Sequence, residues 1–198
     1  MSEQLLSLVV FAAVMTFSPG SNNVLMATSG IQVGLRRSIP LGLGVVSGVA
    51  VLLTVAAVGL GGIIHTMPSL QVVMKTIGSA YLVWLGWKIA HAGPPTYATT
   101  SARTYGFRAG FINTMLNPKG WTMALSAAAG YSALASDSVR LSVLFSIVFV
   151  SLGIPNWFVW CRSGETLARL LRTEQQWQIA NAALGGLVML SLVPMWLE

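Results

Sequence analysis

The feature that most constrains this chain is the recurrence of long windows without a charged side chain. Four such windows cover residues 4–35, 38–74, 141–161 and 175–197. Each can hold a helix of roughly 20 residues, the length that crosses the apolar core of a bilayer. Only 8% of the residues are charged, against about a quarter in a typical soluble domain. The sequence therefore predicts an all-α integral membrane protein whose surroundings are a lipid bilayer.

Six membrane-spanning helices fit the alternation of apolar segments with short polar ones. We expect them at residues 5–28, 39–64, 70–90, 107–131, 139–161 and 177–196. The longest polar segment, residues 92–106, is rich in turn-forming residues and is the expected middle loop. It divides a single transmembrane domain, residues 1–198, into a first repeat of about residues 1–91 and a second of about residues 107–198.

Basic residues are distributed unequally between the two sides of this arrangement. Eight Lys and Arg residues fall in or beside the first, third and fifth connections, whereas two, Lys75 and Arg140, fall near the others. Short cytoplasmic loops carry an excess of basic residues, so we expect these three loops in the cytoplasm and both termini outside. The basic residues form no patch interleaved with aromatic residues, so the net charge of +6 does not indicate nucleic acid as a partner.

Two of the expected spans are interrupted by proline at corresponding places. Pro19 interrupts the first span and Pro118 the fourth, 99 residues apart in a chain of 198. Each half contains three spans, an odd number, so the two halves insert with opposite orientations. Broken spans at matching places in inverted halves are the best sequence indication of a transporter site. We therefore expect two inverted three-helix repeats with a binding site between the breaks.

Both breaks carry polar residues that an ordinary membrane helix avoids. Proline frees backbone groups, which must find partners in protein or in a water-filled cavity. The helix that begins after a break directs its free N–H groups at such a cavity, where an anion is stabilised. Asn156 follows Pro155 at a third kink, where a packing hydrogen bond and a place in the cavity wall are both open. The candidate substrate-binding residues are Pro19, Gly20, Asn22, Asn23, Asn113, Asn117, Pro118, Lys119 and Asn156.

Lys119 is the one charged residue between Arg108 and Asp137. By helical rise it lies roughly 16 Å from Arg108, about half the thickness of the bilayer core. An ionised lysine at that depth costs at least about 2.5–3.5 kcal/mol. No Asp or Glu lies within an expected span. Lys119 is therefore uncharged, solvated by water and carbonyls, or paired with a ligand carboxylate; the structural alternative is that it snorkels to an interface or caps the broken helix.

Other chemistry-bearing residues point to no cofactor or metal. Cys161 is the single cysteine, which excludes a disulfide and a redox pair within the chain, and His65 and His91 stand apart from other ligands. No strand precedes the glycines of residues 41–48, so they indicate close helix packing and not a nucleotide site. No Walker motif is present, so ATP is not the direct energy source.

Three segments resemble motifs of a known family. "TFSPGSNNVLMATSGIQVGLRRSIPLGLGVVSG" is similar to the first-span signature of the LysE/RhtB-type amino-acid exporters, "IGSAYLVWLGWKIA" to their third span and "FRAGFINTMLNPKGW" to their fourth. The resemblance implies a bacterial inner-membrane exporter of amino acids or close derivatives. One departure is Ser18 and Ser21, where relatives often read Thr-Pro-Gly-Pro. The residues at the family's motif positions are Pro19, Gly20, Asn22, Asn23, Asn117, Pro118 and Lys119.

Together these features predict a secondary transporter, not an enzyme, that exports small amino acids. Neutral substrates are favoured because no carboxylate in a span could pair with a cationic one. An exporter of another small solute or of a divalent metal, and a channel, are the alternatives, although a metal exporter needs ligand clusters that the spans lack. A homo-oligomer is an open alternative to a monomer.

Overall fold

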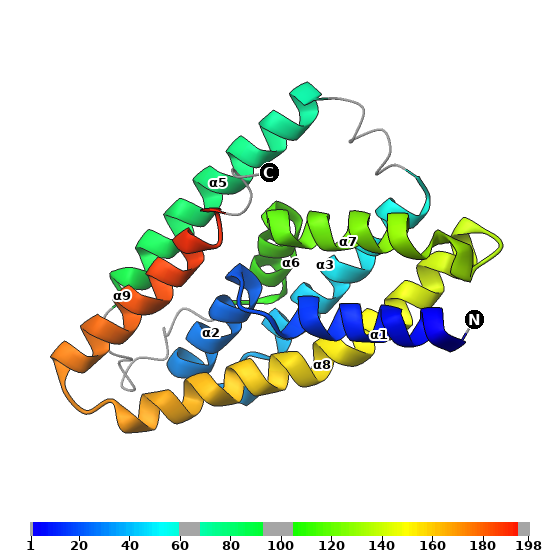
Figure 1. The fold of residues 1–198 in the computed structure, drawn as a ribbon. Helices are drawn as coiled ribbons and strands as arrows, with labels where there is room; N and C mark the ends of the chain where they lie inside the picture. Colours follow the sequence, from blue (N-terminus) through cyan, green and yellow to red (C-terminus); the bar gives the residue numbers. More distant parts are fainter. Residues whose placement is uncertain (1, 60–67, 93–104, 194–198) are drawn as a thin grey trace.

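The structure, a computed structural model, describes residues 2–59, 68–92 and 105–193. Within these residues all regular structure is helical, which confirms the predicted all-α class. Most of the expected middle loop, residues 93–104, lies outside the described residues. The elements are α1 (Ser2–Phe17), α2 (Ser21–Arg37), α3 (Ile39–Ala57), α5 (Pro68–Ala90), α6 (Phe107–Leu116), α7 (Pro118–Tyr131), a short 3₁₀ turn η1 (Ser132–Leu134), α8 (Ser138–Leu170) and α9 (Glu174–Leu190) (Figure 1).

Two of the described helices, α3 and α8, are each long and apolar enough to cross a membrane by themselves. α1 and α2 form a third candidate when they are taken as one span bent by 53°. Parts of the expected second and sixth spans, residues 60–64 and 194–196, lie outside the described residues. The described part of the chain therefore supports two or three spans, and six remains a prediction.

Two of the expected boundaries are wrong. α2 continues beyond residue 28, the expected end of the first span, and kinks at Gly34 (φ 75°, ψ 172°), so Arg36 and Arg37 follow a break in the helix. α8 continues to Leu170 instead of ending at residue 161. There Glu165 forms ion pairs with Arg162 and Arg169, each at 2.9 Å, one turn away on the same helix. The hydrogen bond from Arg162 holds the pKa of Glu165 below its usual value, so this carboxylate stays ionised.

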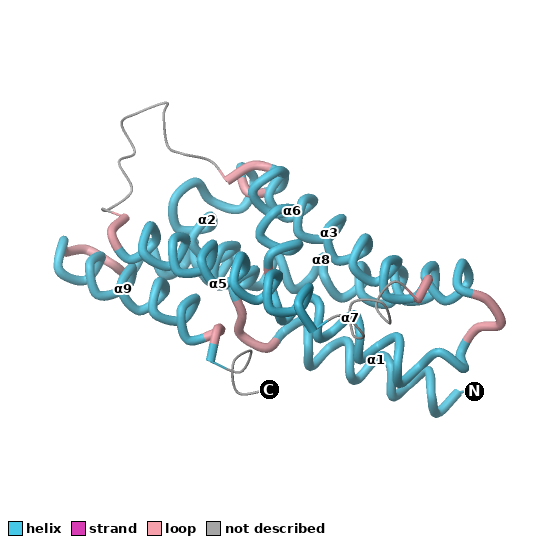
Figure 2. The backbone as a smooth tube through the Cα atoms, turned by 90° about the horizontal axis from the view of Figure 1, so that it is seen from above, coloured by secondary structure: helices cyan, strands magenta, loops and turns pink. Residues whose placement is uncertain are grey.

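Buried apolar side chains form two clusters toward opposite ends of the molecule, as Figures 1 and 2 show by the placement of their helices. The first cluster lies where α2, α5 and α9 meet the N-terminal part of α3 and the C-terminal part of α8. It consists of Val24, Leu25, Met26, Ile31, Leu41, Val45, Leu82, Leu85, Ile89, Cys161, Trp177, Leu184 and Val188. The second cluster lies where α1 and α7 meet the other halves of α3 and α8. It consists of Leu8, Ala12, Leu52, Leu53, Ala56, Ala57, Met123, Ala124, Ala127, Leu141, Phe145 and Phe149.

Among the described residues, glycines allow four helix pairs to approach at backbone distance, one of them α5 and α6 through Gly78 and the Leu116 carbonyl. In each pair, a Cβ atom added to the glycine would overlap the backbone of the partner helix, so a larger residue does not fit. Gly44 takes part, and a Cβ on Gly42 or Gly48 would overlap a side chain of another helix, which confirms that these glycines serve helix packing. The other three pairs follow. The contacts are Gly30 with the Cys161 carbonyl and Gly164 with the Ala27 carbonyl (α2 and α8), Gly44 with the Phe107 carbonyl and Gly110 with the Leu41 carbonyl (α3 and α6), and Gly86 with Gly185 (α5 and α9).

Candidate functional site

The first break separates α1 from α2 and leaves the start of α2 uncapped. Gly20 precedes α2 in an extended conformation, and no side chain caps this helix. The Asn23 amide turns back and donates to the carbonyls of Thr16 (3.1 Å) and Ser18 (2.8 Å). Proline cannot continue the helical hydrogen bonds here, so Asn23 supplies the donors that the end of α1 lacks.

The second break separates α6 from α7 and is capped by its own sequence. Asn117 has a non-helical conformation (φ −83°, ψ 111°), and its Oδ1 accepts from the backbone N–H of Lys119 at 3.1 Å. Pro118 then occupies the first helical position, where its missing N–H is not needed. The local sequence Asn-Pro therefore starts α7 as an ordinary capped helix.

Lys119 connects the two breaks. Its Nζ donates to the Ser18 carbonyl (2.6 Å), the Ser18 hydroxyl (2.8 Å) and the Pro19 carbonyl (3.3 Å). Its stem passes Gly20 so closely that a Cβ there would lie 3.1 Å from the Lys119 Cδ. All three ammonium protons thus have acceptors at the C-terminal end of α1, where a cation is favoured. Of the alternatives open at the sequence level, solvation by backbone carbonyls describes this structure.

The asparagines of α2 extend this network to two further helices. Asn22 Oδ1 accepts from Asn113 Nδ2 (2.5 Å) on α6 and from Thr114 Oγ1 (3.3 Å). Asn23 Oδ1 accepts from Asn156 Nδ2 (3.0 Å) on α8. The hydrogen bonds therefore join predicted residues that lie far apart in the sequence.

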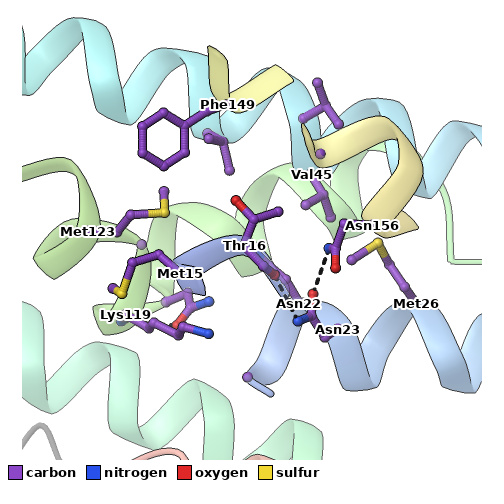
Figure 3. A pocket seen from close by; sticks show the side chains of 16 residues that line it. Met15, Thr16, Asn22, Asn23, Met26, Val45, Lys119, Met123, Phe149 and Asn156 are labelled. Atoms are coloured by element: carbon purple, nitrogen blue, oxygen red, sulfur yellow. Dashed lines mark hydrogen bonds between the residues drawn. The ribbon is translucent and has the colours of Figure 1, made fainter. Parts of the chain in front are cut away.

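A cavity of about 60 Å³ lies beside this network (Figure 3). Its wall contains residues of both apolar clusters, among them Met26 and Val45 of the first and Met123 and Phe149 of the second. Its volume corresponds to roughly four to six water molecules. Among the predicted site residues, those in the cavity wall are Gly20, Asn22, Asn23, Asn117, Lys119 and Asn156.

Three predicted residues do not line the cavity. Pro19 is exposed, Asn113 is buried behind Asn22, and Pro118 begins α7. Their roles in this structure are to form the breaks and to hold Asn22. They therefore support the cavity wall without contributing to its surface.

Sequence reasoning missed the apolar part of the wall. A methionine that faces a cavity has the same helical spacing as one in a packed core, so periodicity does not distinguish them. Thr16 was the one missed residue with a usable signal, since it is polar and directly precedes the break. The missed residues are Met15, Thr16, Met26, Val45, Val46, Val49, Gly120, Met123, Phe149 and Gly153.

The electrostatics of the wall favour a small ligand with both donors and acceptors. Lys119 contributes a cation, and no Asp or Glu is among the lining residues. Asn156 Oδ1 is buried without a hydrogen-bond partner. Within residues 2–59, 68–92 and 105–193, no group of three His, Cys, Asp or Glu residues could hold a metal ion.

Comparisons with known proteins agree with the family resemblance of the sequence motifs. The model of the family described as LysE type translocator matches residues 13–193. A cysteine/O-acetylserine efflux protein of Klebsiella pneumoniae is 25% identical over 162 residues, 82% of each chain. A leucine efflux protein of Enterobacter sp. is 25% identical over 191 residues, 89% of this chain and 87% of that protein. A homoserine/homoserine lactone efflux protein of Salmonella typhimurium is 22% identical over 183 residues, 90% and 89% of the two. No solved structure matches the chain.

Proposed function

The chain belongs to the LysE type translocator family, and from this premise we propose that it is a secondary transporter exporting small neutral amino acids or close derivatives across a bacterial inner membrane. Members of this family are transporters, so the chain is not an enzyme. The efflux proteins to which it is similar are named for cysteine, O-acetylserine, leucine and homoserine. The observation that carries the proposal is the cavity between the two breaks, in which Lys119 is the one charged residue of the wall.

The size and lining of the cavity favour a small zwitterion. A volume of about 60 Å³ suits a small ligand. A cationic side chain would meet no carboxylate in the wall, and transferring an unpaired charge into such a site is costly. The side chain of a neutral substrate would instead contact Met26, Met123 and Phe149, which are buried and apolar.

The substrate carboxylate would bind at Lys119 beside the uncapped start of α2. All three ammonium protons are directed at protein oxygens, so the carboxylate must replace at least one of them. The Pro19 carbonyl, at 3.3 Å, is the most distant of the three acceptors. A carboxylate makes a stronger, charge-assisted bond than a carbonyl does, and the N-terminal end of α2 favours the same negative charge.

The packing of the helices supports two inverted repeats of three spans each. We match α1, α2, α3 and α5 to α6, α7, α8 and α9. If the halves are exchanged, the contact of α2 with α8 corresponds to the contact of α7 with α3. In the same way, the contact of α3 with α6 corresponds to the contact of α8 with α1. All four contacts occur in the structure. Within each exchanged pair one contact is much more extensive than the other, and among the described residues the contacts of α2 with α3, of α2 with α9 and of α5 with α6 lack equal counterparts, so the symmetry is approximate. Movement of α1 and α7, one from each half, about the paired breaks would give alternating access.

Transport into everted membrane vesicles tests the proposal. Labelled cysteine, leucine and homoserine should be compared with labelled lysine, and we expect the wild type to accumulate at least one neutral amino acid in preference to lysine. Lys119→Met removes the charge and keeps the stem, so we expect transport to fall by roughly tenfold or more with normal amounts in the membrane. Lys119→Arg keeps the charge in a larger planar group and should retain part of the activity.

The matched control is Lys88→Met. Lys88 lies over the ring of Trp84, 4.7 Å from its centroid, and is outside the cavity, so this variant should transport normally. A wild type that moves none of the neutral amino acids would reject the proposed function. Normal transport by Lys119→Met would leave Lys119 as a cap on α1 and remove it from the substrate site.

A further inference from the structure

We propose that Asn156 recognises the α-ammonium group of the substrate, accepting a hydrogen bond from it through Oδ1. Asn156 lies on α8 and lines the cavity. It is 4% exposed, yet its Oδ1 has no hydrogen-bond partner within the described part of the chain. The inference rests on the proposed function, since it requires that the cavity bind an amino acid.

The neighbouring hydrogen bonds determine which way the Asn156 amide faces. Asn23 donates through Nδ2 to two carbonyls, those of Thr16 and Ser18. Asn23 therefore presents its oxygen, not its nitrogen, to α8. Asn156 must meet that oxygen with its own Nδ2, at 3.0 Å. Turning the Asn156 amide would place two carbonyl oxygens against each other, so Oδ1 is held as the unpaired atom.

Other unpaired buried polar atoms lack this combination of orientation and place. Asn113 Oδ1 does not line the cavity, and Asn113 and Asn22 can both turn their amides and keep one hydrogen bond between them. The Ser21 hydroxyl can rotate to another direction, and it does not line the cavity either. Trp157 Nε1 is a donor and could not bind an ammonium group. Asn156 thus carries a fixed, unpaired acceptor on a residue that lines the cavity.

Lys119 and Asn156 lie at separate places in the wall, with Thr16 and Asn22 drawn between them (Figure 3). They are connected through Ser18 and Asn23: Lys119 and Asn23 both donate to the Ser18 carbonyl, and Asn156 donates to Asn23. One end of this series of hydrogen bonds offers donors to a carboxylate, and the other offers an acceptor to an ammonium group. The ligand class that uses both ends is a compound with an unmodified amino group and carboxylate, as in an α-amino acid.

Competition with modified substrates tests the assignment. The probe is the labelled amino acid, among cysteine, leucine and homoserine, that wild-type vesicles accumulate best. The competitors are the same amino acid, the 2-hydroxy acid with the same side chain, and the amino-acid amide. In the wild type we expect the 2-hydroxy acid to compete roughly ten- to a hundredfold more weakly than the amino acid, the loss expected when a charged donor no longer meets its acceptor.

The variants separate the two ends of the substrate. In Asn156→Leu, discrimination against the 2-hydroxy acid should fall to near unity, while discrimination against the amide should persist. We express discrimination as the inhibitory concentration of a competitor divided by that of the unmodified amino acid. Lys119→Arg, with an altered carboxylate site, should change this ratio for the amide and leave the ratio for the 2-hydroxy acid unchanged. Asn181→Ala is the matched control, because Asn181 is another buried asparagine that donates to the Ala92 carbonyl and lies outside the cavity; both ratios should stay at wild-type values.

Two results would overturn the assignment: a 2-hydroxy acid that competes with the wild type as well as the amino acid does, or an Asn156→Leu protein that still discriminates. The first needs no variant. If Asn156→Leu does not accumulate in the membrane, Asn156→Ala also removes the amide oxygen, supplies no other acceptor from its side chain and is read in the same way. A wild type that transports no amino acid is a different outcome, which rejects the proposed function itself.

Discussion

At the scale of single residues, the adjacent asparagines Asn22 and Asn23 differ in exposure and in the hydrogen bonds that they make. Asn23 is 4% exposed and makes three hydrogen bonds, two to the end of α1 and one to α8. Asn22 is half-buried, and its oxygen accepts from Asn113 on α6 while it lines the cavity. Both residues line the cavity, but the side chain of Asn23 also holds the first break together, whereas that of Asn22 is the more exposed of the two.

This difference predicts separable effects of two alanine variants. Asn23→Ala leaves the buried Asn156 Nδ2 without its acceptor and the partly buried Thr16 carbonyl without this donor. Because an unpaired buried group costs about 1–3 kcal/mol, the variant should have a lower thermal midpoint in detergent. Asn22→Ala should reduce transport with a smaller change in that midpoint, because water in the cavity can replace its side chain. Fluorescence-detected thermal unfolding and vesicle transport measure the two effects. Equal losses of stability would contradict the division of roles.

The sequence predicted which residues form the breaks but not which of them meet. Pro19 and Pro118 mark the ends of helices because the effect of proline on its own helix is local. The partner of Lys119 is Ser18, on a segment about a hundred residues earlier, and one sequence carries no signal of that pairing. Met123 and Phe149 were missed for a related reason: their faces are apolar whether they contact a core or a cavity.

At the scale of elements, α5 and α9 meet through Gly86 and Gly185. The space around Gly185 differs sharply from the space around the adjacent Gly186. A Cβ on Gly185 would overlap the Gly86 carbonyl and lie 2.7 Å from Ala90 Cβ, whereas one on Gly186 would meet nothing within 4 Å. The two glycines are adjacent on one helix, so they share local helix geometry and differ in packing. The short-range pattern of the sequence does not tell them apart.

Gly185→Ala and Gly186→Ala therefore form a matched pair. We expect Gly185→Ala to destabilise the protein by roughly 1–3 kcal/mol because α5 and α9 must separate. Gly186→Ala should be neutral or stabilising by up to about 1 kcal/mol, since alanine favours the helix. Thermal unfolding in detergent compares the two. The packing of α5 on α9 would need revision if the two variants behaved alike, or if Gly186→Ala were the less stable.

Helix length was the least predictable property at this scale. The first span was expected to end at residue 28, but α2 continues to a kink at Gly34 before it reaches Arg36 and Arg37. Arg162, Glu165 and Arg169 continue α8 because their spacing allows ion pairs on one face. The composition of a window indicates where lipid can surround a helix, and it does not indicate where the helix ends.

At the scale of the whole molecule, the proposed topology makes a prediction about location. Two three-span halves, together with the bias of basic residues, would place both termini outside and the middle loop in the cytoplasm. A reporter fused within residues 92–106, most of which lie outside the described residues, should therefore read cytoplasm. A second reporter fused after Glu198 should read the exterior. If both fusions reported the same side, the six-span arrangement would be wrong.

The glycine contacts also make the molecule unequally stiff along its length. Around the first cluster, α2 with α8, α3 with α6, and α5 with α9 touch backbone to backbone, and no rotamer change can relax such a contact. In the second cluster α1 and α7 pack through side chains, and Gly120 there meets the flexible end of Leu52. Helices move more easily where side chains can change rotamer than where backbones touch. We therefore expect α1 and α7 to supply most of the displacement when the cavity opens, while the α5–α9 end moves as one block.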